Sequence, residues 1–259
     1  MVASTDFASV FGRYEFLIRR LHSLTGLIPV GGFMVFHLAT NAAILDGPEA
    51  FQHRIDLIHS LGPTTIMLLE WPFIFVPLIF HALIGLIIVS RGERNMASYP
   101  FEGNVRYTLQ RVTGVIAFLF IFAHVFHMHG WIKFEWWLDW VRPFGGGQFA
   151  HVHPSDPALD PNYGATTAAA AIQASWVIFI LYAVGILASV YHLANGLWTM
   201  GITWGVWTSP QAQKWANIPC AAFGVFLAVV GLGALVGMQI APLPESVELP
   251  AELVLEDAG

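Results

Sequence analysis

Long apolar stretches separated by short polar segments dominate the chain. Five of these stretches reach the roughly 20 residues that a helix needs to cross a hydrocarbon core of about 30 Å. They predict membrane-spanning helices at about residues 22–45, 66–90, 107–131, 173–201 and 216–241. We therefore expect an all-α fold, a polytopic membrane helical bundle with five transmembrane helices.

Two segments after the third apolar stretch differ from the other connectors. Residues 131–140 mix tryptophan with charged residues, which is typical of a short interfacial helix. The stretch Val141–Thr167 is rich in Gly, Pro and Asp and predicts an irregular surface loop. We assign both to an outer loop, residues 132–172, within one domain of residues 1–241. The acidic tail, residues 242–259, is expected to be disordered.

Composition supports a membrane protein and narrows the function. Of the 259 residues, 56% are hydrophobic and only 11% charged, too few charges to cover a soluble domain of this size. The net charge of −6 argues against a nucleic-acid partner. The single cysteine, Cys220, excludes an intrachain disulfide and a thiolate-ligated iron–sulfur cluster held by this chain alone.

The distribution of Lys and Arg predicts the orientation. With five spans, the N-terminus and the loops 91–106 and 202–215 share one side. That side carries Arg13, Arg19, Arg20, Arg91, Arg94, Arg106, Arg111 and Lys214, and the opposite side carries Arg54, Lys133 and Arg142. The excess of positive charge places the N-terminus in the cytoplasm and the C-terminus outside. The segment Met1–Tyr14 is neither basic nor apolar enough for a cleaved signal, so the first helix is expected to direct insertion.

Each of the first four predicted spans carries a histidine in its interior: His37, His81, His124 and His192. An ionisable side chain inside a span is costly and indicates a functional site. For one such histidine, a hydrogen bond between helices would explain it as well as metal ligation would. One on each of four consecutive helices favours ligation. The rise per residue places His37 and His124 in the outer half of the membrane and His81 and His192 in the inner half.

A faint internal repeat gives the same two pairs. Thr25–Ile28, before His37, resembles Thr113–Ile116, before His124. Likewise the run from His81 to Gly85 resembles the run from His192 to Gly196. Helices 1–2 therefore resemble helices 3–4.

Paired imidazoles on facing helices are suited to hold a flat macrocycle, which predicts two haem groups between helices 1–4. Gly85 and Gly196, one turn after their histidines, are expected to leave clearance for the porphyrin. Two axial imidazoles saturate the iron and favour electron transfer. Because the chain has no Cys-x-x-Cys-His motif, the haems are expected to be of the non-covalent b type.

Several motifs resemble one known family. They are the runs Arg19–Leu24, Gly26–His37, Pro77–Ala82, Leu109–Gly114 and His192–Trp198, with Thr203–Gly205 following. All are similar to the single-chain, two-haem cytochrome b anchor of bacterial succinate:quinone oxidoreductases, and the resemblance extends from Tyr14 to about Gly237. In that family the equivalents of the four histidines are the axial ligands, in the pairs given above.

The resemblance implies partners and a role in the bacterial inner membrane. A flavoprotein that oxidises succinate and an iron–sulfur subunit would dock on the cytoplasmic face, and electrons would pass through both haems to a quinone, usually menaquinone. The same anchor could instead serve a fumarate reductase running in the other direction. Two further alternatives are the cytochrome b anchor of a hydrogenase or formate dehydrogenase and a haem-free transporter with a proton-relay histidine chain.

Other polar residues near the two membrane surfaces are weaker candidates. Glu70, at the outer start of helix 2, could handle protons for a quinone or be an interfacial glutamate. Ser23 and Arg111, near the cytoplasmic end, could hold propionates of the inner haem, as could neighbouring Arg20, His22 and Thr203. His127 competes with His124 as the outer ligand. It could also form an external metal site with His129, His151 and His153.

Overall fold

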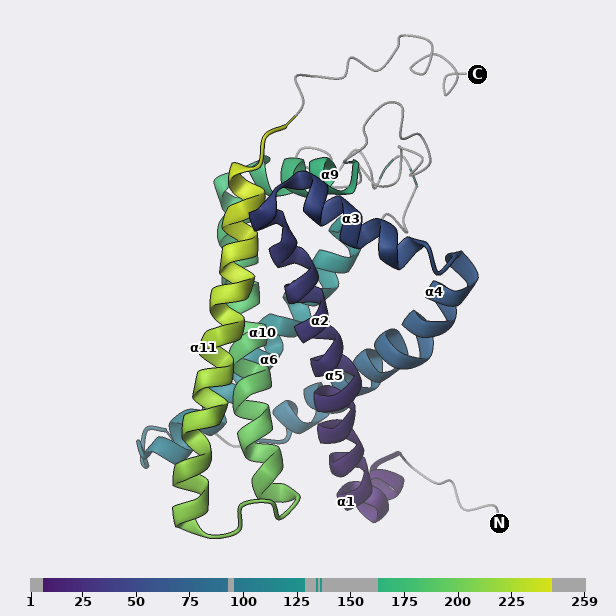
Figure 1. Ribbon diagram of the computed structural model, residues 1–259. Coiled ribbons are helices and arrows are strands. Elements are labelled where there is room, and N and C mark those ends of the chain that lie inside the picture. Colours follow the sequence, from purple (N-terminus) through teal and green to yellow (C-terminus); the bar gives the residue numbers. More distant parts are fainter. Residues whose placement is uncertain (1–6, 93–95, 129–133, 135, 137–162, 244–259) are drawn as a thin grey trace, which may run out of the picture.

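The computed structural model describes residues 7–92, 96–128, 134, 136 and 163–243, and every regular element in these segments is a helix (Figure 1). The first long segment consists of α1 (Phe7–Thr25), η1 (Gly26–Gly31), α2 (Gly32–Asn41) and η2 (Ala42–Asp46). After α3 (Pro48–His59) the second consists of α4 (Pro63–Glu70), η3 (Trp71–Phe75) and α5 (Val76–Ser90). The remaining helices are α6 (Glu102–Met128), α9 (Tyr163–Gln173), α10 (Trp176–Thr203) and α11 (Pro210–Ile240).

The five predicted spans are confirmed. Five helical segments in the described part are long and apolar enough to cross a membrane: Gly12–Asp46, Pro63–Ser90, Glu102–Met128, Trp176–Thr203 and Pro210–Ile240. Four of them begin earlier in the chain than the apolar pattern predicts, because the helices continue into the polar residues that flank the apolar stretches. At the start of α11, for example, the Ser209 hydroxyl caps the helix by accepting a hydrogen bond from the Ala212 amide at 3.1 Å.

Helix α10 lies between α6 and α11 and packs extensively against both (Figure 1). Its face toward α11 and α2 contributes Val190 and Leu193 to a buried cluster with Leu38 and Leu227. Leu227 is fully enclosed, with 1% of its surface exposed. This packing holds the helix that carries His192 rigidly against its neighbours.

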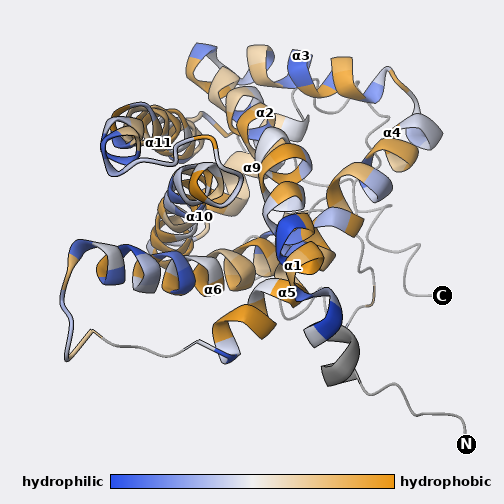
Figure 2. Cartoon of the chain, turned by 90° about the horizontal axis from the view of Figure 1, so that it is seen from below, coloured by the Kyte–Doolittle hydropathy of each residue, from blue (hydrophilic) through white to orange (hydrophobic). Residues whose placement is uncertain are grey.

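The outward faces of the spans are apolar and exposed. Phe73, Leu119, Ile180 and Val229 are each more than half exposed, and together such side chains form a hydrophobic surface far larger than soluble monomers tolerate. Seen from the end where α1 begins, hydrophilic residues gather at the near ends of α1, α6 and α11 (Figure 2). This distribution is that of a bundle surrounded by lipid.

At the other end, α3 and α9 pack across the bundle (Figure 1). Phe51 of α3 and Ala165 of α9 share a buried cluster with Ile44, and the Gln52 side-chain oxygen accepts a hydrogen bond from the Gly164 amide at 2.7 Å. The irregular loop predicted over Val141–Thr167 is therefore wrong from Tyr163 onward. Helix α9, which begins there and continues into the alanine run of residues 168–171, has high helix propensity and buries small side chains against α3.

Some predictions fall on parts of the chain that the structure does not describe. Residues 141–162 of the predicted loop and 244–259 of the acidic tail lie outside the described residues. So does the predicted interfacial helix, apart from Phe134 and Trp136.

Candidate functional site

His81 of α5 and His192 of α10 meet inside the bundle. Their ring centroids are 6.0 Å apart and the ring planes are inclined by 82°. The two histidines come from helices far apart in the sequence, and the predicted inner pair is thus formed in space.

The backbone fixes the ring orientation of this pair. Nδ1 of His81 lies 2.8 Å from the carbonyl oxygen of His22, and Nδ1 of His192 lies 2.9 Å from the carbonyl oxygen of Gln110. A carbonyl oxygen can only accept, so each Nδ1 carries the hydrogen and donates it. Nε2 of each ring is left with its lone pair. Histidines that ligate metals commonly donate the other ring N–H to a carbonyl in this way.

A glycine lies against each ring of the inner pair. A Cβ atom on Gly26 would overlap the His81 imidazole, and one on Gly114 would come within 2.8 Å of Cε1 of His192. In both cases the glycine follows the hydrogen-bonding carbonyl by four residues, one turn along the same helix. The Thr-Gly repeat noted in the sequence therefore provides two equivalent glycine contacts, Gly26 for the His81 ring and Gly114 for the His192 ring.

His37 of α2 and His124 of α6 form a second pair. Their ring centroids are 5.8 Å apart, with planes inclined by 73°. A phenylalanine one turn earlier contacts each ring, Phe33 at 5.5 Å from His37 and Phe120 at 5.7 Å from His124 between centroids. The predicted outer pair is also brought together.

Tyr182 of α10 connects the outer pair to His127. Its hydroxyl lies 3.3 Å from Nδ1 of His124 and 2.7 Å from Nδ1 of His127. A hydroxyl has one hydrogen, so it can accept from one ring while donating to the other. His127 thus lies beside His124 as a neighbour that shares its tyrosine, while it is His124 that faces His37.

A π-helical turn brings the two halves into register. His37 follows Gly26 by eleven residues, whereas His124 follows Gly114 by ten. The segment η1, Gly26–Gly31, is π-helical and contains Pro29, while α6 is regular throughout. A π-turn accommodates one extra residue, and such turns are frequent at functional sites. The extra residue in the first half is absorbed there, which places His37 opposite His124.

A polar network extends from His192 toward the end of the bundle. The Gln110 side chain donates to the His192 carbonyl oxygen at 3.1 Å and accepts from the Asn195 amide at 2.7 Å. Asn195, which is 5% exposed, accepts in turn from Nε of Arg106 at 2.9 Å. Arg106 also donates to Asn217 of α11 and lies over the Trp198 ring. This network ties α6, α10 and α11 together beside the inner pair.

Gly85 and Gly196, the glycines predicted to give clearance for the porphyrin, do not lie against the His81 and His192 rings. A Cβ on Gly85 would face the His22 side chain at 3.3 Å, and one on Gly196 would face the Gln110 side chain at 3.5 Å. His22 itself stacks on His81, with centroids 4.0 Å apart and planes within 8°. Gly85 and Gly196 therefore border the groups that hold the inner histidines.

Ser23 and Arg111, the two residues proposed to hold haem propionates, differ in their hydrogen-bond partners. The Ser23 hydroxyl donates to the Arg20 carbonyl oxygen at 2.9 Å and accepts from the Trp204 indole at 3.0 Å. Arg111 donates to the Ile88 carbonyl oxygen at 3.3 Å through Nη2, while its buried Nη1 has no hydrogen-bond partner among the described residues. The buried Nδ1 of His22 has none there either.

Glu70 lies farther from the start of its helix than the sequence pattern suggested. The second span begins at Pro63, so Glu70, predicted at its opening, is the last residue of α4 and directly precedes the π-turn η3. Glu70 follows Pro63 by seven residues, which correspond to about 10 Å of helix. Its side chain is half-buried.

Three-ligand metal sites are absent from the described part of the chain, where no three His, Cys, Asp or Glu side chains cluster. Each histidine pair thus offers two imidazoles, without a third His, Cys, Asp or Glu clustered with them in that part of the chain. The external metal site suggested for His127 involves His129, His151 and His153, which lie outside the described residues.

Comparison with known proteins agrees with the resemblance of the motifs. The chain is 34% identical over 224 residues to the succinate dehydrogenase cytochrome b558 subunit of Bacillus subtilis (strain 168), covering 86% of this chain and 97% of that protein. The chain belongs to this family of cytochrome b subunits. No family model and no solved structure matches it.

Sequence reasoning missed the contacts that hold the histidines of this family member. The Thr-Gly repeat was visible, and it could have identified Gly26 and Gly114 as the glycine contacts of His81 and His192. Nothing in the sequence singled out Tyr182, because a tyrosine in an apolar span cannot be distinguished from an ordinary packing aromatic residue. Gln110 and Asn195 were present in the family motifs without an assigned role.

Proposed function

We propose that this chain is the membrane anchor and cytochrome b subunit of a succinate:quinone oxidoreductase, with two bis-histidine haems b. His81 and His192 would hold the inner haem, and His37 and His124 the outer one. The observation that carries the proposal is the pair of Nδ1–H to carbonyl hydrogen bonds, which leaves Nε2 of both inner histidines available as ligands.

The separations within the pairs fit one metal ion between two rings. An ion bonded at about 2 Å to a nitrogen of each ring holds the two ring centroids roughly 6 Å apart. The observed values are 6.0 Å and 5.8 Å. Bound there, haem b would supply reversible one-electron transfer, and the two imidazoles of each pair would be its protein ligands.

The surrounding residues would orient the rings and hold charge. Gly26 and Gly114 leave the room that the imidazoles need, and the carbonyls of His22 and Gln110 fix their rotation. The buried Nη1 of Arg111, without a partner among the described residues, suits a haem propionate. The Ser23 hydroxyl, bonded at both its donor and its acceptor side, is less suited.

The two pairs lie at different depths in the bundle. Ten residues of regular helix separate Gly114 from His124, about 15 Å along the axis and half the thickness of a hydrocarbon core of about 30 Å. Electrons from an iron–sulfur subunit on the cytoplasmic face would thus reach a quinone near the outer end. The relative is named as a subunit of succinate dehydrogenase, which favours succinate oxidation over fumarate reduction and over a hydrogenase or formate dehydrogenase anchor.

The test is a reduced-minus-oxidised visible spectrum with a redox titration of the purified chain. Two one-electron b-type components are expected. His81→Ala and His192→Ala should both remove one component, while His37→Ala and His124→Ala should both remove the other. A matched control is His53→Ala, on α3 and outside both pairs, which should keep both components.

Three results would contradict the proposal. A spectrum without a low-spin b-type band would indicate a haem-free protein. Loss of the same component in the His81 and His124 variants would overturn the pairing. Retention of both components in the His124→Ala variant, with loss of one in His127→Ala, would move the outer ligand to His127.

A further inference from the structure

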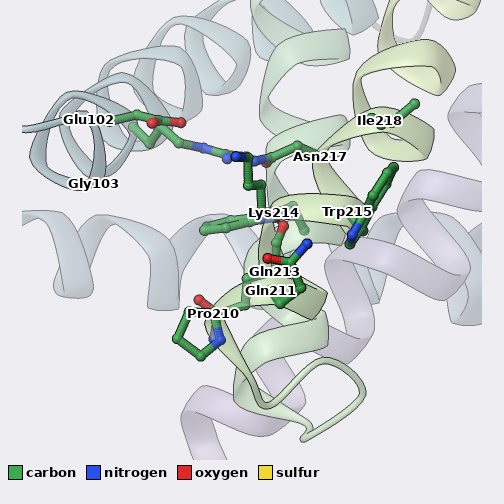
Figure 3. Close-up of a pocket in the computed structure, with 11 residues that line it drawn as sticks. Glu102, Gly103, Pro210, Gln211, Gln213, Lys214, Trp215, Asn217 and Ile218 are labelled. Atoms are coloured by element: carbon green, nitrogen blue, oxygen red, sulfur yellow. Dashed lines mark hydrogen bonds between the residues drawn. The ribbon is translucent and has the colours of Figure 1, made fainter.

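A cavity of about 850 Å³ opens between the N-terminal ends of α6 and α11, beside α10. Figure 3 shows Glu102 and Gly103 of α6 on one side and the first turns of α11 facing them. Arg106 and Trp198 complete the wall. The four histidines lie elsewhere, so this cavity is separate from the proposed haem sites.

The cavity wall carries an excess of positive charge. Arg106 and Lys214 contribute two cations, and Glu102 contributes one carboxylate. Arg106 uses Nε and one hydrogen of Nη1 for Asn195 and Asn217, which leaves three of its five N–H donors for another partner. No hydrogen bond or ion pair joins the Lys214 side chain to any other residue that the structure describes.

The wall is also built to hold those donors in place. The Arg106 guanidinium lies 3.6 Å from the centroid of the Trp198 ring, and the Trp198 indole donates to the Gln213 carbonyl oxygen at 2.9 Å. The guanidinium is therefore fixed by Asn195, Asn217 and Trp198 before any ligand arrives. The long helix α11 begins at Pro210 in the same wall, and the positive end of its dipole favours an anion there.

The rim of the cavity is apolar and open to the membrane. Trp215 is 63% exposed and Ile218 61% exposed, and both belong to a helix that crosses the membrane. Tryptophan at the end of a span is typical of the headgroup level of a bilayer. A ligand here would thus have its polar part against Arg106 and Lys214 and an apolar part against Trp215 and Ile218.

We propose that this cavity binds the phosphate headgroup of an anionic phospholipid. Net positive charge, pre-oriented guanidinium donors and an apolar rim at headgroup level together match a phosphate that carries acyl chains. Basic pockets between spanning helices on the cytoplasmic side are a recognised site for such lipids. A neutral quinone would gain little from the two cations.

The proposal can be tested by native mass spectrometry of the detergent-purified full chain, titrated with phosphatidylglycerol or phosphatidylcholine. The wild-type chain should retain phosphatidylglycerol more tightly than phosphatidylcholine. Lys214→Gln should weaken phosphatidylglycerol binding about fivefold, which corresponds to about 1 kcal/mol for one basic residue near a membrane surface. Phosphatidylcholine binding should not change.

Arg19→Gln is the matched control, because Arg19 is an exposed cation on the same side, paired with Glu15 at 2.7 Å and outside the cavity. It should bind phosphatidylglycerol like the wild-type chain, and Lys214→Arg should restore binding. Equal weakening by Arg19→Gln, or no change with Lys214→Gln, would overturn the proposal. So would displacement of phosphatidylglycerol by millimolar inorganic phosphate, or a quinone retained at the site in its place.

Discussion

Nδ1 of His192 donates a hydrogen bond to the carbonyl oxygen of Gln110 over 2.9 Å, and the Gln110 side chain donates back to the His192 carbonyl oxygen over 3.1 Å. The two residues are joined twice across the interface of α6 and α10. The first bond fixes the imidazole, and the second fixes the backbone that carries it. His81 has one such bond, to the His22 carbonyl oxygen, and a stacked His22 ring in place of the second.

The close contacts of Gly26 and Gly114 with the inner histidines predict that substituting either glycine removes one b-type component and keeps the other. Gly26→Ala and Gly114→Ala each place a methyl group where the His81 or His192 ring now lies, so the ring must move and the inner pair must separate. We expect each variant to lose the same b-type component that His81→Ala loses, and to keep the other. Redox titration of the visible spectrum measures this.

Gly32→Ala is the control for this prediction, because a Cβ on Gly32 would meet no atom within 4 Å. It lies on the same span as Gly26 and should keep both components. An unchanged spectrum in both Gly26→Ala and Gly114→Ala would show that the inner histidines do not need a glycine at these positions.

The network beyond Gln110 predicts a loss of stability. Asn195→Leu leaves the Gln110 side-chain oxygen and Nε of Arg106 without their partner in a part-buried setting, at a cost of about 1–3 kcal/mol. The single cysteine, Cys220, is 5% exposed, so its reaction with a thiol-specific dye during heating reports unfolding. The unfolding temperature should fall.

Asn104→Leu is the comparison for Asn195→Leu. The Asn104 amide bonds only the Tyr99 carbonyl oxygen at the start of α6, at 2.8 Å, and its loss should lower the unfolding temperature much less. Equal effects of the two substitutions would contradict the role given to the network.

The sequence was sufficient for the spans and for the pairing of the histidines, because both follow from the length and rise of single helices. It was insufficient to predict which residues contact the imidazole rings. Gly85 and Gly196 were chosen to give clearance for a porphyrin, and that role stays a prediction. The close approach to the imidazole rings comes from the facing helix, at Gly26 and Gly114. Which residues of the facing helices touch the rings depends on packing and on the π-turn at Gly26–Gly31.

The hydroxyl of Tyr182 predicts a change confined to the outer haem. If His124 binds iron through Nε2, its Nδ1–H donates to that hydroxyl and makes the ligand more basic. Tyr182→Phe removes the acceptor, so the ferric form is less stabilised and the midpoint potential of the outer component should rise. One hydrogen bond corresponds to about 20–60 mV for a one-electron couple.

Redox titration of Tyr182→Phe should therefore show one shifted component and one unshifted. Tyr191→Phe, on the same helix and without a side-chain hydrogen bond among those described, should shift neither. A shift of both components, or a fall in potential, would contradict this account of Tyr182.

Glu70 predicts a defect in quinone turnover without a defect in the haems. It is a half-buried carboxyl group inside the second span, about 10 Å from the start of the helix, where an ionisable group indicates function. Glu70→Gln keeps the size of the side chain and removes its proton chemistry. If Glu70 delivers a proton to the reduced quinone, succinate:quinone activity of the assembled complex should fall about 10²-fold, at the lower end for a positioned acid–base group.

Both b-type components should stay unchanged in Glu70→Gln. The activity of Glu49→Gln, which alters an exposed carboxylate of α3, should also stay unchanged. Because the glutamine cannot protonate the quinone at any pH, raising the proton concentration should not restore the variant to wild-type rates. Full activity in Glu70→Gln would place proton delivery elsewhere.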